Sequence, residues 1–532
     1  MPLLRARAIF RSISPSYISR AFPTLAKPSN SLPVYHRLSS YSIHHFSSLS
    51  NLHQQQNMDS ITELCMIPGP VEVEASVLKA MSTKATSHMD PRFIASLSEL
   101  IKNLKVVFGS TSAQPFVIAG SGTLGWDQVA ANILEQGDKA LVLSNGYFGD
   151  GFGDCLKAYG ADVTVLNAKI GDSFKLDQVE AELKSKNYKI VTVSHVDTSS
   201  GVVADVEGVC NIVKRVSPDT RVVVDSVCAA AAERLYMDKW GVDVVIAASQ
   251  KALGCPPGVS IVIASQRVID ALNQRTSSIP AYYVSWKRWL PVMQSYEAKK
   301  GAYFATPCVQ TMMALDVSVR HIVEQGMEEV FSKHEKVSAQ FTEAIKRVGL
   351  RPVPLDDSLR SNAMSAVWLP EGISYPDLAA KMFSHGIVIS GGIFKGYATQ
   401  YFRIGHMGIS ATNQSLHNVD ATVQALFGSL LELGYKHTSP SQTKSIDKNN
   451  LRVRIISNDS ESQTAISGLG RRVGQLDVGQ TENAEYEGTK PDQSPHPTAT
   501  RLVLFSSGSK GTETSPPRYA GGSPPEDVSY LK

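Results

Sequence analysis

Seven short runs of apolar, often β-branched residues constrain the fold of this chain more than any other feature. They read FVIAG, KALVLSNG, DVTVLNA, KIVTVSH, RVVVDS, DVVIAAS and GVSIVIAS and lie within residues 116–265. Stretches with helical spacing, such as LGWDQVAANILEQ and DVEGVCNIVKRV, separate them. Strands that are apolar almost throughout are typical of a mostly parallel sheet with helices on both faces. We therefore predict an α/β fold whose large domain contains a mostly parallel seven-stranded sheet.

The pattern changes after Thr306, where two long helical stretches are followed by mixed strands. The helical stretches cover residues 309–326 and 327–349, and strand-like runs such as NAMSAVWLP and GIVISGG come next. This order predicts a second, smaller α+β domain. We expect the large domain at residues 58–310 and the small C-terminal domain at residues 311–436.

The two ends of the chain differ in composition from the part between them. Residues 1–57 are rich in Arg and Ser and contain no Asp or Glu, which predicts a mitochondrial transit peptide; a plain disordered tail is the alternative. Residues 437–532 are polar and rich in Ser, Thr, Gly and Pro. They bury too little surface to offset the entropy of ordering, so we expect a disordered tail. Met58 could serve as a second start, giving a cytosolic or peroxisomal form beside the one in the mitochondrial matrix.

Bulk properties exclude several classes of protein. Six basic residues and no acidic ones precede Asp59, so the rest of the 532-residue chain has a formal charge of −3 although the whole has +3. A slightly acidic chain after residue 58 offers no electrostatic basis for binding nucleic acid. No apolar stretch reaches the roughly 18 residues that a membrane-spanning helix needs. The six cysteines show no CxxC spacing and no accompanying His cluster, which argues against a zinc site, another metal site or a secreted disulfide scaffold.

Small, polar and charged residues follow the predicted strands. Ligands of open α/β sheets bind beyond the carboxyl ends of the strands, so these residues are the candidates for a site. After successive strands come Gly120, Ser121, Gly122 and Thr123; then Asn145 to Phe148; then His195 and Thr198; then Asp225; and finally Ser249, Gln250 and Lys251.

Each of these residues also has an ordinary structural interpretation. A Gly-Ser-Gly turn is a common start of a helix, Phe148 can be a core residue, and Asp225 can be a capping acid. We expect His195 to be a buried structural histidine. Lys251 alone would be read as the start of a surface loop, because lysine is almost never fully buried. The combination at one sheet edge is what indicates a ligand.

Pyridoxal phosphate (PLP) needs this combination. Its phosphate binds backbone N–H groups at a helix N-terminus together with hydroxyls, and its ring stacks on a flat side chain such as Phe148. Its pyridine nitrogen stays protonated beside an anion, for which Asp225 is the candidate. Its aldehyde forms a Schiff base with a neutral amine, and desolvation at the end of an apolar strand favours neutral Lys251. We therefore predict a PLP site with Lys251 and Asp225 as catalytic residues.

Seven motifs along the chain form a familiar set. MIPGPVEV, SGT, NGYFGD, VDSV, SQKALGCPPG, YFATP and YFRIGHMG occur in this order within about residues 60–436. The set resembles the class V aminotransferases, and within them the alanine–glyoxylate and serine–glyoxylate group. This resemblance implies the type I fold of PLP-dependent transferases and a homodimer with shared active sites.

The resemblance also implies roles for individual residues. Lys251 would be the Schiff-base lysine and Asp225 the partner of the pyridine nitrogen. Phe148 stands where many relatives carry Trp, and Thr198, where many carry Ser, would bind the 3-hydroxyl of the cofactor. Arg403 would bind the substrate carboxylate, and Gly69 would lie where the N-terminal segment crosses the pocket. The phosphate of the cofactor would be bound by Ser121, Gly122 and Thr123, with Ser249 and Gln250 assisting. Tyr303 and Thr306 would reach the same phosphate from the other subunit.

The implied reaction is transfer of an amino group from a small amino acid, with alanine favoured, to glyoxylate by a ping-pong Schiff-base mechanism. The products are glycine and pyruvate. Charge counting agrees, because 2-oxoglutarate needs a cation for each carboxylate and the motifs contain one, Arg403. Arg275 and Arg288 are candidates for a second, but the sequence does not give their direction. The alternatives are serine–glyoxylate or serine–pyruvate transfer, a lyase with Cys65 or Cys308 as nucleophile, and a catalytically silent PLP-binding protein.

Overall fold

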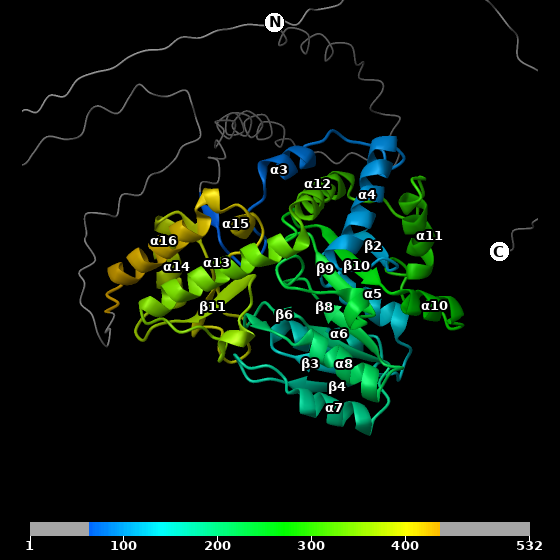
Figure 1. Ribbon diagram of the computed structural model, residues 1–532, viewed down its shortest axis with the longest axis horizontal. Coiled ribbons are helices and arrows are strands. Elements are labelled where there is room, and N and C mark those ends of the chain that lie inside the picture. The colour runs from blue at the N-terminus through cyan, green and yellow to red at the C-terminus, as the bar shows by residue number, and fades with distance from the viewer. Residues whose placement is uncertain (1–62, 437–532) are drawn as a thin grey trace, which may run out of the picture. The chain divides into compact units, whose positions relative to one another are not determined.

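The computed structural model of the chain describes residues 63–436 (Figure 1). The predictions of a transit peptide at residues 1–57, a second start at Met58 and a disordered tail at residues 437–532 lie outside the described residues. Within the described part, no helix combines the length and the apolar character needed to cross a membrane.

The large sheet has the seven strands expected from the sequence. β10 is antiparallel to both of its neighbours, and every other neighbouring pair is parallel. All residues of β5, β9 and β10 are buried, because helices cover both faces of the sheet. The order across the sheet is β2 (Gln114–Ala119), β10 (Val259–Ala264), β9 (Val244–Ala248), β8 (Arg221–Asp225), β5 (Ile190–Ser194), β3 (Lys139–Ser144) and β4 (Asp162–Asn167).

Helices connect these strands and form one large core with the sheet. The local sequence explains their boundaries. In α4, for example, Asp90 accepts a hydrogen bond from the backbone of Arg92 at the start of the helix, and Phe93, Leu97 and Leu104 recur at helical spacing on the buried face. The elements are α3 (Ala75–Met81), α4 (Pro91–Val107), α5 (Leu124–Ile133), α6 (Tyr147–Ala158), α7 (Leu176–Ser185), α8 (Val206–Val216), α9 (Met237–Trp240), α10 (Gln266–Gln274), α11 (Trp286–Glu297), α12 (Val309–Gln325) and the hairpin β6 (Val196–Asp197) and β7 (Val202–Val203).

A second, smaller core forms around a three-stranded antiparallel sheet in the order β11-β14-β13. Figure 1 shows α13, α14 and α16 grouped with β11. The elements are α13 (Met327–Arg347), η2 (Asp357–Leu359), β11 (Met364–Trp368), α14 (Tyr375–Ser384), β12 (Ile387–Val388), β13 (Ser390–Gly391), β14 (Tyr401–Gly405), α15 (Ile409–Thr412), η3 (Gln414–Leu416) and α16 (Asn418–Glu432).

The boundary between the two cores differs from the expected division at residue 310. α12 packs against α3 and α4, so its buried residues Leu315 and Val319 belong to the large core. The smaller core takes its first buried helical residue, Phe341, from α13. It also includes an N-terminal segment, because β1 (Leu64–Cys65) pairs in parallel with β12 and Met66 is buried there. Pairing between distant segments decided this detail, and local sequence pattern does not report such pairing.

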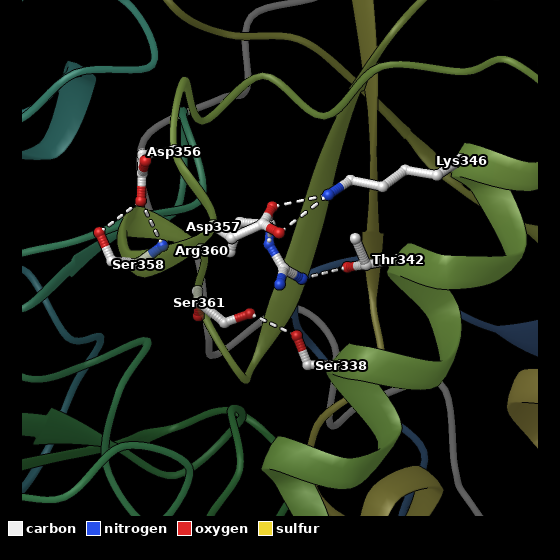
Figure 2. Close-up of polar contacts among 8 residues, drawn as sticks. All are labelled: Ser338, Thr342, Lys346, Asp356, Asp357, Ser358, Arg360 and Ser361. Carbon is white, nitrogen blue, oxygen red and sulfur yellow. Dashed lines mark hydrogen bonds and ion pairs between the residues drawn. The ribbon is translucent and has the colours of Figure 1, made fainter.

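The loop before β11 makes contacts with both the smaller core and the large core. Figure 2 shows it fastened to α13 by an ion pair between Asp357 and Lys346 at 2.7 Å and by a hydrogen bond from Ser338 to the carbonyl of Ser361 at 2.9 Å. The Ser361 hydroxyl donates to the buried Glu233, and the Ser361 N–H donates to the carbonyl of Gly201. β11 and β14 are therefore held beside the carboxyl edge of the large sheet.

Candidate active site

A cavity of about 190 Å³ lies at the carboxyl edge of the large sheet. Strands β2, β5, β8 and β9 run in the same direction and bring the residues that follow them to this edge. The cavity is lined by Ser121, Gly122, Thr123, Trp126, Phe148, Ser194, Val196, Thr198, Asp225, Val227, Cys228, Gln250 and Lys251.

Lys251 is almost completely buried, with 8% of its surface exposed. Its Nζ donates to the carbonyl of Pro68 in the N-terminal segment. Burial lowers the pKa of the amine, because the charged form loses water, and the nearby Arg403 lowers it further, although Cys228 and Asp225 oppose the fall. Gly69 lies against this side chain, and a Cβ there would overlap the lysine. A buried amine with a lowered pKa suits nucleophilic and proton-transfer chemistry.

Asp225 ends β8 and is buried at another wall of the cavity. Its Oδ1 accepts a hydrogen bond from the N–H of Val227 at 3.0 Å, and its Oδ2 accepts one from Nε1 of Trp126 at 2.7 Å. Burial raises the pKa of the carboxyl to about 6, although both hydrogen bonds and the nearby Lys251 favour the anion. The carboxylate is thus held at two points and faces a space with room for a ligand.

The start of α5 forms a further wall. Ser121 and Thr123 lie on this turn with their hydroxyl oxygens 2.7 Å apart, and the first N–H groups of the helix follow. A Cβ on Gly122 would lie 3.0 Å from Val227, so glycine permits the close approach of the turn to the strand after β8. The N–H groups of Leu124, Gly125 and Trp126 donate to the carbonyls of Ser121, Gly122 and Thr123. Hydroxyls at a helix N-terminus, where the helix dipole is positive, favour an anion such as phosphate.

Phe148 lies in the first turn of α6, and two buried residues hold that turn in place. Oδ2 of Asp197 accepts hydrogen bonds from the N–H groups of Phe148 and Gly149, each at 3.1 Å. The Ser199 hydroxyl accepts from the N–H of Tyr147 at 3.0 Å and donates to Oδ1 of Asp197 at 2.6 Å. Asp197 therefore orients the turn that carries Phe148, whose ring is the aromatic platform of the cavity. Burial raises the pKa of Asp197, and the bonds from Ser199, Gly149 and Phe148 oppose that rise.

Arg403, on β14 of the smaller sheet, reaches the same region without lining the cavity itself. Its Nε donates to the carbonyl of Gly391 at 2.7 Å and its Nη1 to the carbonyl of Thr198 at 3.2 Å. Thr198 lines the cavity, so this hydrogen bond holds the guanidinium at the rim of the cavity. Within residues 63–436, Nη2 has no hydrogen-bond partner in the protein.

Some expected residues lie elsewhere. Ser249 does not line the cavity, because its hydroxyl donates to the carbonyl of Pro256 and accepts from the N–H of Val259, which stabilises the turn after β9. Tyr303 and Thr306 do not line the cavity of their own chain either. His195 is buried, burial lowers its pKa to about 4, and it is absent from the cavity wall, which agrees with a structural role.

The structure adds cavity residues that the sequence reasoning missed: Trp126, Ser194, Val196, Val227 and Cys228. Four of them, Ser194, Val196, Val227 and Cys228, lie at a strand end or within three positions of one, and could have been found by considering that range. The sequence did not indicate Trp126 as a cavity residue, because it lies within a helix whose apolar spacing is explained by packing in the core. No cluster of His, Cys, Asp or Glu within residues 63–436 could hold a metal ion.

Comparison with known proteins identifies the family. Residues 73–404 match the family described as Aminotransferase class-V. Alanine–glyoxylate aminotransferase 1 of Saccharomyces cerevisiae is 40% identical over 371 residues, which cover 68% of this chain and 95% of the yeast protein. The chain belongs to the class V aminotransferases. The resemblance seen in the motifs is thereby confirmed.

Two further relatives place this aminotransferase in the glyoxylate aminotransferase group. Serine–glyoxylate aminotransferase of Arabidopsis thaliana is 28% identical over 346 residues, covering 64% of this chain and 84% of the plant protein. The crystal structure of an alanine–glyoxylate aminotransferase from Nostoc sp. superposes with a TM-score of 0.66 at 27% identity, covering 71% of this chain and 97% of that one.

Class V aminotransferases use PLP, and the residues of the cavity fit that group. The carboxyl group of Asp225, the amine of Lys251 and the flat ring of Phe148 all line one cavity. The hydroxyls at the start of α5 supply a phosphate-binding end. Each functional group of the cofactor therefore has a matching residue type at this edge of the sheet.

Proposed function

We propose that this aminotransferase uses PLP to transfer the amino group of L-alanine to glyoxylate, giving pyruvate and glycine. The observation that carries the proposal is that, among residues 63–436, Arg403 is the one arginine placed at the rim of the cavity. Arg403 is held by two backbone carbonyls through Nε and Nη1, which leaves Nη2 for one substrate carboxylate. Glyoxylate is also the acceptor in the names of the three relatives described above, whereas the donor varies between alanine and serine.

The other two candidate cations are occupied elsewhere in this chain. Arg275 donates to the carbonyl of Ala131 and to Ser277. The guanidinium of Arg288 lies over the ring of Tyr282, 4.0 Å from its centroid. Neither lines the cavity, and a dicarboxylic acceptor such as 2-oxoglutarate would bury a second carboxylate without a cation.

The cavity residues divide the work of transamination among them. When bound, PLP supplies the electron sink for the bond that breaks at the α-carbon of the amino acid. Asp225 in its anionic form would hold a proton at the pyridine nitrogen, and Phe148 would pack on the ring. Arg403 orients the substrate carboxylate. The Nζ of Lys251, with its lowered pKa, takes a proton from the substrate as a neutral amine and returns it during transfer.

A matrix of donors and acceptors tests the proposal with purified protein that begins at Met58. The donors are L-alanine and L-serine, and the acceptors are glyoxylate, pyruvate and 2-oxoglutarate. We expect kcat/KM with alanine as donor to be higher for glyoxylate than for 2-oxoglutarate. A preference for 2-oxoglutarate would contradict the charge argument and require a second cation.

Serine–glyoxylate transfer is the second candidate, and the name of the Arabidopsis relative favours it. A higher kcat/KM for serine than for alanine in the same matrix would select it, and serine–pyruvate transfer would appear in the pyruvate column. Lyase chemistry through Cys65 or Cys308 has less support, since burial raises the pKa of both thiols and so disfavours the reactive thiolate. A silent binding protein would leave the absorbance of bound PLP unchanged on adding alanine.

We further propose that the enzyme is a homodimer in which Tyr303 and Thr306 reach the phosphate of the partner's cofactor. In support, Tyr303 is exposed, with 59% of its surface accessible, and its hydroxyl lies 3.2 Å from that of Thr306. Light scattering gives the mass in solution. Tyr303→Phe should weaken PLP binding without dissociating the dimer, and unchanged affinity would contradict the role.

The cellular location is a proposal based on composition. We propose that residues 1–57 direct import into the mitochondrial matrix, as their basic, acid-free composition suggests. Fusing residues 1–57 to a fluorescent reporter tests this, and a diffuse reporter would contradict it. A chain spanning residues 58–436 should retain full activity if residues 437–532 have no catalytic role.

A further inference from the structure

The indole of Trp126 connects two of the groups that would hold the cofactor. Its Nε1 donates to Oδ2 of Asp225 at 2.7 Å, across 99 positions of sequence. Its ring stacks on Phe152 with a centroid distance of 5.4 Å and an interplanar angle of 11°. Phe148 approaches the same indole edge-on, at 6.5 Å and 66°. A single side chain on α5 thus contacts both the carboxylate and the aromatic platform of the cavity.

The two oxygens of Asp225 receive one donor each. The N–H of Val227 binds Oδ1, and the indole N–H binds Oδ2. Among residues 63–436, the indole is the only side chain that donates a hydrogen bond to this carboxylate. A carboxylate oxygen accepts more than one hydrogen bond, so both oxygens can still accept a bond from a ligand. Without the indole, the orientation of the carboxylate about its last side-chain bond would rest on one backbone N–H.

The charge state of Asp225 also depends on the indole N–H. Burial favours the neutral acid, and the hydrogen bonds from Val227 and Trp126 favour the anion. A hydrogen bond to a buried charged group is stronger than one between neutral groups. The indole N–H therefore does more than fill space, since a phenylalanine of similar shape would pack on Phe152 and leave the anion less stabilised.

Building on the proposed function, we propose that Trp126 is a positioning residue for transamination, whose N–H holds Asp225 as an anion oriented toward the pyridine nitrogen of PLP. Its ring also lies edge-on to Phe148. Trp126 itself transfers no proton and forms no bond with the substrate. Its effect should therefore appear in the affinity for PLP and in kcat, and much less in the KM for the amino acid.

Trp126→Phe tests the donor, and Trp286→Phe is a matched control. Trp286 is fully buried, its Nε1 donates to Oε1 of Gln128 at 3.0 Å, and its ring stacks on Phe116 at 4.9 Å and 10°. It does not line the cavity. Both variants lose one buried indole hydrogen bond, so both should unfold at a lower urea concentration. We expect only Trp126→Phe to raise the Kd for PLP, by about tenfold, as measured by equilibrium dialysis of the apoprotein.

The kinetics and a double variant complete the test. Trp126→Phe should lower kcat with little change in the KM for alanine. In an Asp225→Asn background it should have almost no further effect on PLP affinity, because the group it orients is gone. Trp126→His retains a ring N–H and should recover part of the affinity. Equal Kd values for Trp126→Phe and the Trp286→Phe control, or full additivity with Asp225→Asn, would overturn the proposal.

These outcomes are separate from a failure of the proposed function. If the wild-type protein bound no PLP, or bound it without transaminating any donor, the proposed function and this inference would both be overturned. If the wild-type protein were active and the Phe and His variants at position 126 bound PLP as tightly as it does, only the positioning role of Trp126 would be wrong.

Discussion

Gly69 lies against Lys251 so closely that a side-chain carbon would have no room. A Cβ at this position would lie 2.5 Å from Cδ and 2.8 Å from Nζ of the lysine. The backbone at Gly69 has a φ of +100°, which residues with a side chain rarely adopt. The N-terminal segment thus passes directly over the reactive amine, whose Nζ donates to the carbonyl of Pro68.

Gly69→Ala should therefore disturb Lys251. We expect a lower content of bound PLP, seen in the absorbance of the purified protein, and a fall in kcat of at least about tenfold, since a misplaced catalytic group loses its positioning advantage. Gly372→Ala is the control, because Gly372 has a φ of +80° and open space around its added carbon. Equal behaviour of the two variants would show that backbone strain alone explains the effect.

Lys251→Ala should abolish turnover while leaving the fold intact. Loss of a positioned acid–base group costs about 10²–10⁴-fold in rate, and the loss of covalent attachment of the cofactor adds to this. Removing a buried amine from a cavity should not lower the urea midpoint markedly. Steady-state turnover and circular dichroism measure the two effects, and normal turnover would rule out this lysine as the catalytic base.

Asp225→Asn should weaken the electron sink without unfolding the protein. A neutral amide keeps the shape of the side chain but no longer holds a proton on the pyridine nitrogen as an anion does. The single-turnover rate of proton removal from alanine should fall by orders of magnitude, as followed by stopped-flow absorbance of the cofactor. A normal rate would mean that another group is the partner of the ring nitrogen.

Arg403→Lys should raise the KM for alanine and for glyoxylate together. Lysine replaces the planar guanidinium with a point charge and does not reproduce the bonds to the carbonyls of Gly391 and Thr198 with the same geometry. We expect a loss of at least about tenfold in kcat/KM for each carboxylate substrate, with kcat changed less. An unchanged KM for both substrates would place the carboxylate elsewhere.

His334 should make the stability of the fold depend on pH. Its Nδ1 lies 2.7 Å from the carbonyl oxygen of Val330, and its Nε2 accepts from the N–H of Gly408 at 3.1 Å, so the buried ring is neutral. Burial lowers its pKa from 6.5 to about 4. The unfolded chain therefore takes up a proton first as the pH falls, and the contribution to stability that is present above pH 6.5 is lost progressively down to about pH 4.

The size of this effect follows from the same shift. At about pH 5 the advantage of His334 should be smaller by about 2 kcal/mol than near neutrality. Urea unfolding of the wild type and of His334→Ala, compared at both pH values, isolates the contribution of this ring from those of other buried histidines. A stability difference that does not change with pH would show that the ring is not held neutral.

Much of the site could be predicted from the sequence, because its residues follow strands that local patterns reveal. The apolar runs predicted each of the seven strands, and the common direction of parallel strands brings Lys251, Asp225, Phe148 and the turn at Ser121 to one edge. This inference does not depend on the order of the strands, since every parallel strand ends at the same edge whatever its neighbours are.

Tertiary structure alone decided the contacts between residues far apart in the chain. The bond from Trp126 to Asp225, the pairing of β1 with β12 and the packing of α12 on α4 each depend on how distant segments come together. The side chain of Ser249 turned away from the cavity to bond Pro256 and Val259, although its neighbours in sequence line the site. Short-range pattern reports which backbone conformation is favoured and which face is apolar. It does not report which distant donor satisfies a buried polar group, because that depends on the packing of the whole fold.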